Sequence, residues 1–154
     1  MNFLSIFVLI PLLMMIALFF AKNRGQINFI AATGATILLA FSAILTYMYL
    51  AERASGNVAE MLFRADVVWY AAFNIHYSVG VDGVSVAMLI LTSVIVFTGV
   101  FASWRIDPLP KEFFLWFCLL SIGVYGFFIS IDLFTMFMFY EIALIPMYLL
   151  IGIW

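Results

Sequence analysis

Charged residues are scarce in this sequence. Only 9% of its 154 residues are Asp, Glu, Lys or Arg, whereas 68% are hydrophobic and the mean hydropathy is +1.26. A water-soluble domain of this length does not need so much apolar surface and does not tolerate so few charges. The composition therefore excludes a soluble enzyme or soluble binding module and predicts an integral membrane protein.

Positive charge is especially limited. Six Lys and Arg residues stand against eight Asp and Glu residues, which gives a formal net charge of -2 at pH 7. Such a balance offers no basic patch for the phosphates of a nucleic acid or for an anionic lipid surface. We therefore expect neither nucleic acid nor anionic lipid as a partner.

Cysteine and histidine occur once each. Cys118 lies inside an apolar run, so it has no second thiol for an internal disulfide or a shared metal, and we expect it to be a packing residue. His76 is expected to be a solvated or hydrogen-bonded loop residue rather than a ligand. Because a glycine-rich phosphate loop and a Cys/His constellation are also missing, we expect no cofactor and no metal in this chain.

Apolar stretches dominate what is present. Stretches of about 20 apolar residues are long enough to cross a hydrocarbon core about 30 Å thick. Five occur, at about 3–21, 27–50, 84–102, 113–131 and 133–154. They predict an all-α fold, a polytopic transmembrane bundle of about five helices that forms a single membrane domain over 1–154. The first stretch has no basic segment before it, so we expect a retained helix rather than a cleaved signal.

The range 51–80 is too polar to span a membrane and too short for a domain. Its aromatic residues, Trp69 and Tyr70 among them, predict an extramembrane loop that lies against the membrane interface. At its end, Asp82 is expected to cap the helix of 84–102 at the membrane surface, after a turn that contains Gly80 and Gly83.

Lys and Arg in the connections predict the orientation. Four of them fall in two connections that share one side of the membrane, namely Lys22, Arg24, Arg105 and Lys111. The opposite side has only the Arg53 and Arg64 of the 51–80 loop. Because positive residues favour the cytoplasm, we expect a multi-pass protein with its N-terminus outside, in a bacterial plasma membrane.

Glu141 interrupts the last apolar stretch. It follows Asp132 by nine residues, which at about 1.5 Å per residue places its carboxyl group about 13 Å into the membrane. A carboxylate at that depth costs about 2.5 to 3.5 kcal/mol on insertion scales and is normally kept only where it faces a polar cavity or relays protons or ions. We therefore predict that Glu141 is the proton-translocating residue. The alternative is a carboxyl group hydrogen-bonded between helices for stability alone.

A buried acid must be protonated, paired or solvated by internal water. Every Lys and Arg is expected to lie in a loop between the five apolar stretches, so a cationic partner of Glu141 would come from outside this chain. Pro146 lies five residues beyond and leaves the carbonyl of Ile142 without its helical donor. A kink and a free acceptor near Glu141 would suit a hydrated cavity, and simple packing is the alternative reading of Pro146.

Small residues mark the stretch of 113–131. Gly123 and Gly126, with Ser121 and Ser130 nearby, predict that another helix approaches closely. We assign them a packing role.

Two segments carry a family resemblance, Val-Gly-Val-Asp-Gly-Val-Ser at 79–85 and Phe-Tyr-Glu-Ile-Ala-Leu-Ile-Pro-Met-Tyr-Leu-Leu-Ile-Gly-Ile-Trp at 139–154. Together they resemble the antiporter-like subunit M of the proton-pumping NADH:quinone oxidoreductase, respiratory complex I. The resemblance covers essentially the whole chain in helix order. Members of that family have about fourteen helices with two inverted repeats, so the resemblance implies that this chain is an N-terminal fragment.

The resemblance implies that Glu141 matches the essential glutamate of the fifth helix, which pairs with a lysine of a later helix. It also implies membership of an oxidoreductase whose quinone reduction, in other subunits, drives proton translocation. NADH, FMN, iron–sulfur clusters and quinone would bind those other subunits. The implied partners of this chain are other membrane subunits, the lipid bilayer and protons.

Two alternatives remain open. One is a subunit of a multi-subunit sodium/proton antiporter, which would use the same scaffold and the same glutamate. The other is a structural or assembly membrane protein without transport. Neighbouring genes would separate the oxidoreductase from the antiporter, because genes for redox subunits favour the oxidoreductase and genes for antiporter subunits favour the exchanger.

Overall fold

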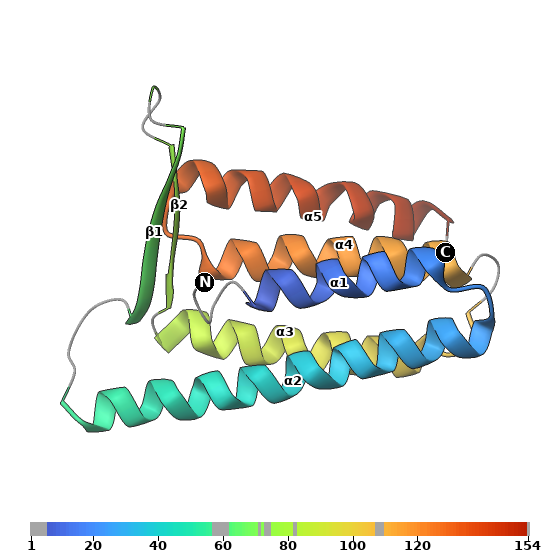
Figure 1. The fold of residues 1–154 in the computed structure, drawn as a ribbon, viewed down its shortest axis with the longest axis horizontal. Helices are drawn as coiled ribbons and strands as arrows, with labels where there is room; N and C mark the ends of the chain where they lie inside the picture. Colours follow the sequence, from blue (N-terminus) through green and yellow to red (C-terminus); the bar gives the residue numbers. More distant parts are fainter. Residues whose placement is uncertain are drawn as a thin grey trace.

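A computed structural model gives the architecture and describes residues 6–56, 62–70, 72, 75–81, 83–106 and 110–153. Five helices form one bundle, in which they run side by side (Figure 1). They are α1 (Ile6–Phe20), α2 (Arg24–Ala54), α3 (Gly83–Ala102), α4 (Pro110–Ile129) and α5 (Leu133–Ile153). Four of these described helices are long and apolar enough to cross a membrane, and α1 is a shorter apolar helix. The predicted helical membrane bundle is confirmed.

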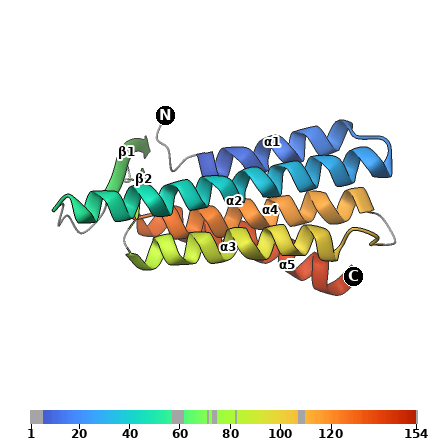
Figure 2. The same ribbon diagram turned by 90° about the horizontal axis from the view of Figure 1, so that it is seen from below.

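The α2 helix extends beyond its apolar stretch at both ends. Its 31 residues give a length of about 46 Å, well above the hydrocarbon thickness of about 30 Å. Figure 2 shows its C-terminal end projecting past the start of α3. The expected range of 27–50 followed hydrophobicity alone, whereas the flanking segment with Glu52 and Arg53 consists of good helix formers that continue the helix into a polar environment.

A β-hairpin occupies most of the range that was expected to be a loop. Strands β1 (Leu62–Tyr70) and β2 (Ile75–Val81) pair antiparallel at one end of the bundle (Figure 1). β-Branched and aromatic residues are abundant in both strands, which favours this pairing. Val79 and Val81 of β2 are buried, so the hairpin is attached to the bundle through its second strand. The hairpin thus lies within the range expected to be an extramembrane loop, and the sequence analysis did not predict its two strands.

His76 lies within β2, opposite Val68 of β1, rather than in a loop. Asp82, the expected helix cap, lies outside the described residues.

The order of packing places α5 at the periphery. The α1 helix packs on α2 and α4, α3 packs on α2 and α4, and α5 packs mainly on α4 and touches β2. Accordingly, 50% of the apolar membrane-spanning part of α4 is buried inside the bundle, whereas only 17% of the corresponding part of α5 is buried. Cys118 of α4 is buried in the core as a free thiol, which confirms its packing role.

One polar pair lies inside the core. The hydroxyl groups of Ser93 in α3 and Tyr125 in α4 are 2.7 Å apart and buried. The ring of Phe7 stacks on that of Tyr125 with a centroid distance of 5.6 Å. Because both hydroxyl groups are withdrawn from water, the hydrogen bond in which one donates to the other gives each a partner and ties α3 to α4.

We expect Tyr125→Phe to lower the free energy of unfolding by about 0.6 to 1.7 kcal/mol, the range for hydrogen bonds between membrane helices. Ser93→Ala should cost a similar amount, and the double variant should cost less than the sum, because both changes remove one interaction. Unfolding in mixed detergent measures all three. Tyr148→Phe on the exposed face of α5 is the control, and additive costs for Ser93 and Tyr125 would contradict the pairing.

Candidate functional site

The candidate site is centred on Glu141, the ninth residue of α5. Eight steps from Leu133 place it about 12 Å along the helix, close to the middle of its 21 residues. The helix begins where the backbone carbonyl of Asp132 accepts from the N–H of Met136 at 2.9 Å. The structure thus places the carboxyl group near the centre of a helix that is long enough to cross a membrane.

The two faces of α5 have different environments. The buried face consists of Thr135, Phe139, Ala143 and Pro146, whose spacing follows one side of a helix. Glu141 follows Phe139 by two residues, which at about 100° each turns it to the other side. There it is exposed in the isolated chain.

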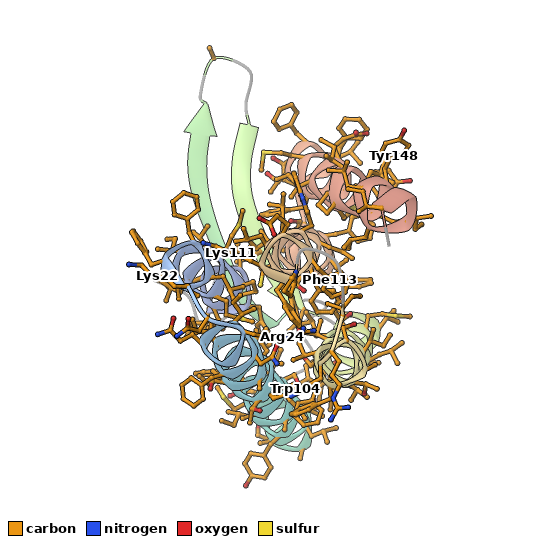
Figure 3. The ribbon with its side chains drawn as sticks, turned by 90° about the vertical axis from the view of Figure 1, so that its right-hand side faces the viewer. Lys22, Arg24, Trp104, Lys111, Phe113 and Tyr148 are labelled. Carbon is orange, nitrogen blue, oxygen red and sulfur yellow. The ribbon has the colours of Figure 1, made fainter. Side chains whose placement is uncertain are left out.

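The exposed face around Glu141 is apolar and aromatic. Phe137 and Ile145, one turn before and after Glu141, are 60% and 59% exposed. Tyr148 lies two turns on and points away from the bundle (Figure 3). Lipid suits such an apolar face as well as protein does, so it is the acid, costly to expose to lipid, that indicates cover by another part of an assembly.

The Glu141 carboxyl group has no hydrogen-bond or ion-pair partner among the described residues. Basic residues lie at the ends of the elements: Arg24 and Lys111 begin α2 and α4, Arg53 is in the last turn of α2, and Arg64 is in β1. They are therefore not confined to loops, as the sequence suggested. None of these four positions is within a membrane-spanning segment at the depth of Glu141.

Pro146 lies on a different side of α5 from Glu141. Five residues of helix separate the two by about 140° around the axis. Pro146 is buried in the face that packs on α4, whereas Glu141 is exposed. A small groove of about 160 Å³ between α4 and α5 is lined by Tyr140, Leu144 and other apolar or aromatic residues, and not by Glu141. The structure therefore gives Pro146 a packing environment and does not bring it together with the acid in one cavity.

Close contact with α4 fixes the position of α5. A Cβ atom added at Gly123 would lie 2.6 Å from the backbone nitrogen of Ala143 and 2.8 Å from the backbone oxygen of Phe139. The phenyl ring of Phe139 fills the space where Gly126 has no side chain. The predicted close approach of another helix is confirmed, and α5 is that helix. The hydroxyl groups of Ser121 and Ser130 instead donate to carbonyl groups of their own helix.

The connections that carry Lys22, Arg24, Arg105 and Lys111 lie at one end of the bundle, as expected. The guanidinium group of Arg24 donates to the carbonyl of Ile106 at 2.8 Å. The ammonium group of Lys111 donates to the carbonyl of Phe19 at 2.7 Å. Figure 3 looks onto this end of the bundle.

Sequence reasoning overlooked Tyr140 and Tyr148. Both carry a phenol hydroxyl on the exposed side of α5, next to Glu141 in the chain and two turns beyond it. The signal that could have found Tyr148 was its spacing of seven residues from Glu141, which returns a helix to the same face. In the described ranges of the chain, there is no group of three or more His, Cys, Asp or Glu residues that could hold a metal ion.

Curated relatives share sequence with nearly the whole chain, while no family model matches it. NADH-quinone oxidoreductase subunit M of Buchnera aphidicola subsp. Schizaphis graminum is 33% identical over 161 residues, which cover 98% of this chain and 31% of the relative. Subunit M of the F(420)H(2) dehydrogenase of Methanosarcina mazei is 26% identical over 151 residues, which cover 97% of this chain and 30% of the relative.

A shorter and more similar match is the NADH-quinone oxidoreductase subunit M of Buchnera aphidicola subsp. Acyrthosiphon pisum. It is 42% identical over 89 residues, which cover 57% of this chain and 18% of the relative. The chain therefore spans about one third or less of the length of the relatives that it matches.

The fold also has a solved counterpart. A chain in the structure of the membrane-bound sulfane sulfur reductase (MBS), an archaeal respiratory membrane complex, superposes with a TM-score of 0.80 at 17% identity. The superposition covers 99% of this chain and 23% of that one, and it establishes the likeness of fold. By its sequence, the chain belongs to the subunit M family of NADH-quinone oxidoreductases.

Proposed function

We propose that this chain forms part of a membrane-arm subunit that translocates protons, with Glu141 as the protonatable group, coupled to quinone reduction in other subunits of an NADH:quinone oxidoreductase. The observation that carries the proposal is a carboxyl group at the middle of a membrane helix, on a face that no other described residue covers. An acid kept at such a position against its insertion cost is functional by default.

The exposed face of α5 is where a partner would act. A cation brought to Glu141 stabilises its carboxylate and releases the proton, whereas withdrawal of that cation favours the protonated acid. The chain itself supplies no such cation among the described membrane-spanning residues, so we assign it to another helix of the assembly. Alternate approach and withdrawal of this cation would convert a conformational change elsewhere into uptake and release of a proton.

The wider assignment rests on the relatives. They are named as subunits of NADH-quinone oxidoreductase and F(420)H(2) dehydrogenase, so we assign this chain to a multi-subunit respiratory complex with other membrane subunits as partners. We place the complex in a bacterial plasma membrane, with the N-terminus of the chain outside. NADH, FMN, iron–sulfur clusters and quinone would bind the other subunits.

A sodium/proton exchanger would use the same acid on the same scaffold, since Glu141 is a hard oxygen ligand that accepts either ion. The two readings differ in what drives the ion. A redox-driven pump moves protons in a medium without sodium as soon as donor and quinone are added, whereas an exchanger needs a sodium gradient.

The test is proton translocation by the complete complex reconstituted in vesicles, with wild-type chain and with Glu141→Gln. We expect the glutamine variant to lose proton translocation, because a side-chain amide neither takes up nor releases a proton near neutral pH. Glu52→Gln, the same substitution at the polar end of α2, is the matched control and should translocate as wild type does. If Glu141→Gln translocated protons at the wild-type rate, the proposal would be contradicted and a structural role for this acid would be favoured.

A further inference from the structure

A groove lies between α1 and α4 on the outside of the bundle, away from Glu141. Its volume is about 550 Å³, which is within the usual range for small-molecule sites. The walls are almost entirely apolar, and Glu112 is the one charged residue among the lining residues, with its side chain exposed at the edge of the groove. The lining residues are Leu12, Met15, Ile16, Phe19, Phe20, Glu112, Leu115 and Trp116.

The groove runs along the last turns of α1 and begins at the first turn of α4. It therefore extends inward from the end of the bundle at which the connections carry Lys22, Arg24 and Lys111 (Figure 3). The eight steps from Leu12 to Phe20 span about 12 Å along the helix axis. A groove of this length, open at the end of a membrane bundle, has room for part of an acyl chain with a headgroup at its mouth.

Opposite charges flank the mouth. Glu112 lines the groove, is exposed, and has no ion-pair partner among the described residues. The ammonium group of Lys111 donates to the Phe19 carbonyl at 2.7 Å and lies 5.6 Å from the centroid of the Phe19 ring, and that ring also lines the groove. Since an ammonium group has three N–H donors, two of them are left for a ligand.

We propose that this groove is a binding site for a zwitterionic phospholipid with a primary ammonium headgroup, phosphatidylethanolamine. Its phosphate accepts from the Lys111 ammonium group, its own ammonium group donates to the Glu112 carboxylate, and an acyl chain fills the apolar groove beside Ile16. The lipid thereby covers apolar surface between the peripheral helix α1 and α4, the helix on which α5 rests.

The charges discriminate between headgroups. A choline headgroup has no N–H to donate to Glu112. A phosphatidylglycerol headgroup carries a net negative charge, which Glu112 repels. The pairing of one basic and one acidic residue at the mouth is complementary to a headgroup that carries both charges.

The test is the lipid retained by the purified complete complex after exchange into nanodiscs with equal amounts of ethanolamine, choline and glycerol phospholipids. Mass spectrometry of the lipids that survive extensive detergent washing gives the amounts. We expect the wild type to retain the ethanolamine lipid at least about fivefold over the other two, a preference equivalent to the net contribution of about one hydrogen bond. Equal retention of all three would overturn the proposal.

Three variants locate the site. Ile16→Trp fills the groove and should release one equivalent of ethanolamine lipid, whereas Ile37→Trp fills the smaller groove between α1 and α2 and should release none. Glu112→Gln leaves the groove open and should abolish the headgroup preference while an acyl chain is still held. An unchanged preference in the Glu112 variant would overturn the assignment, as would a protein helix in the groove in a density map of the complex.

Discussion

Glu141→Asp is expected to retain a measurable part of the proton translocation that Glu141→Gln loses. Aspartate keeps a titratable carboxyl group and shortens its reach by one methylene, whereas glutamine keeps the length and removes the titration. Loss of a positioned proton-transfer group typically lowers a rate by about 100-fold or more. We therefore expect the order wild type, aspartate, glutamine in proton translocation by the reconstituted complex.

The stability of the same variants separates function from packing. Placing an acidic residue at the bilayer centre costs about 2.5 to 3.5 kcal/mol on insertion scales, and a neutral amide costs less. If Glu141 serves transport, Glu141→Gln should assemble at least as well as the wild type and unfold at the same or a higher temperature. If the acid instead holds helices together, glutamine and aspartate variants would both lose assembly, and their activities would fall in step with the amount of complex.

The helices could be predicted because hydrophobicity reports the membrane directly. Each of the five apolar stretches corresponds to a helix, since a chain that crosses lipid must satisfy its own backbone hydrogen bonds. The ends of the helices could be predicted less well. The α2 helix continues through Glu52 and Arg53, and hydropathy does not report a helix once it leaves the membrane.

The hairpin was missed for a related reason. The range 51–80 was interpreted through its polarity, which excludes a membrane span but does not distinguish a loop from a strand pair outside the membrane. The aromatic residues of β1, Trp69 and Tyr70 among them, were assigned to the membrane interface instead. The pairing of β1 with β2 depends on contacts between segments, and a hydropathy profile does not contain them.

The environment of Glu141 was predicted in part. Its depth followed from residue counting, and its lack of a local cation followed from the positions of Lys and Arg. Its separation from Pro146 could also have been found, because five residues of helix place two side chains on different sides. The face of α5 that packs on α4 could not be predicted in this way. It depends on the contact of Gly123 and Gly126 with Phe139 and Ala143.

That contact gives the second large expected effect. Gly123→Ala adds one methyl group, which would lie 2.6 Å from the backbone nitrogen of Ala143. Backbone atoms of α5 cannot rotate away as a side chain can, so the helix must shift as a whole. We expect a loss of about 1 to 3 kcal/mol in the free energy of unfolding, the usual cost of overpacking. Unfolding of the purified protein in mixed detergent is the measurement.

Gly152→Ala is the matched control, because a Cβ atom added there meets nothing within 4 Å. The same methyl group in the same bundle should then leave stability unchanged or slightly higher, since alanine favours a helix over glycine. The Gly123 variant should also translocate fewer protons per complex, although its carboxyl group is intact, because a displaced α5 carries Glu141 away from its partner. Normal translocation by a destabilised Gly123 variant would mean that the α4–α5 contact supports the fold without positioning the acid.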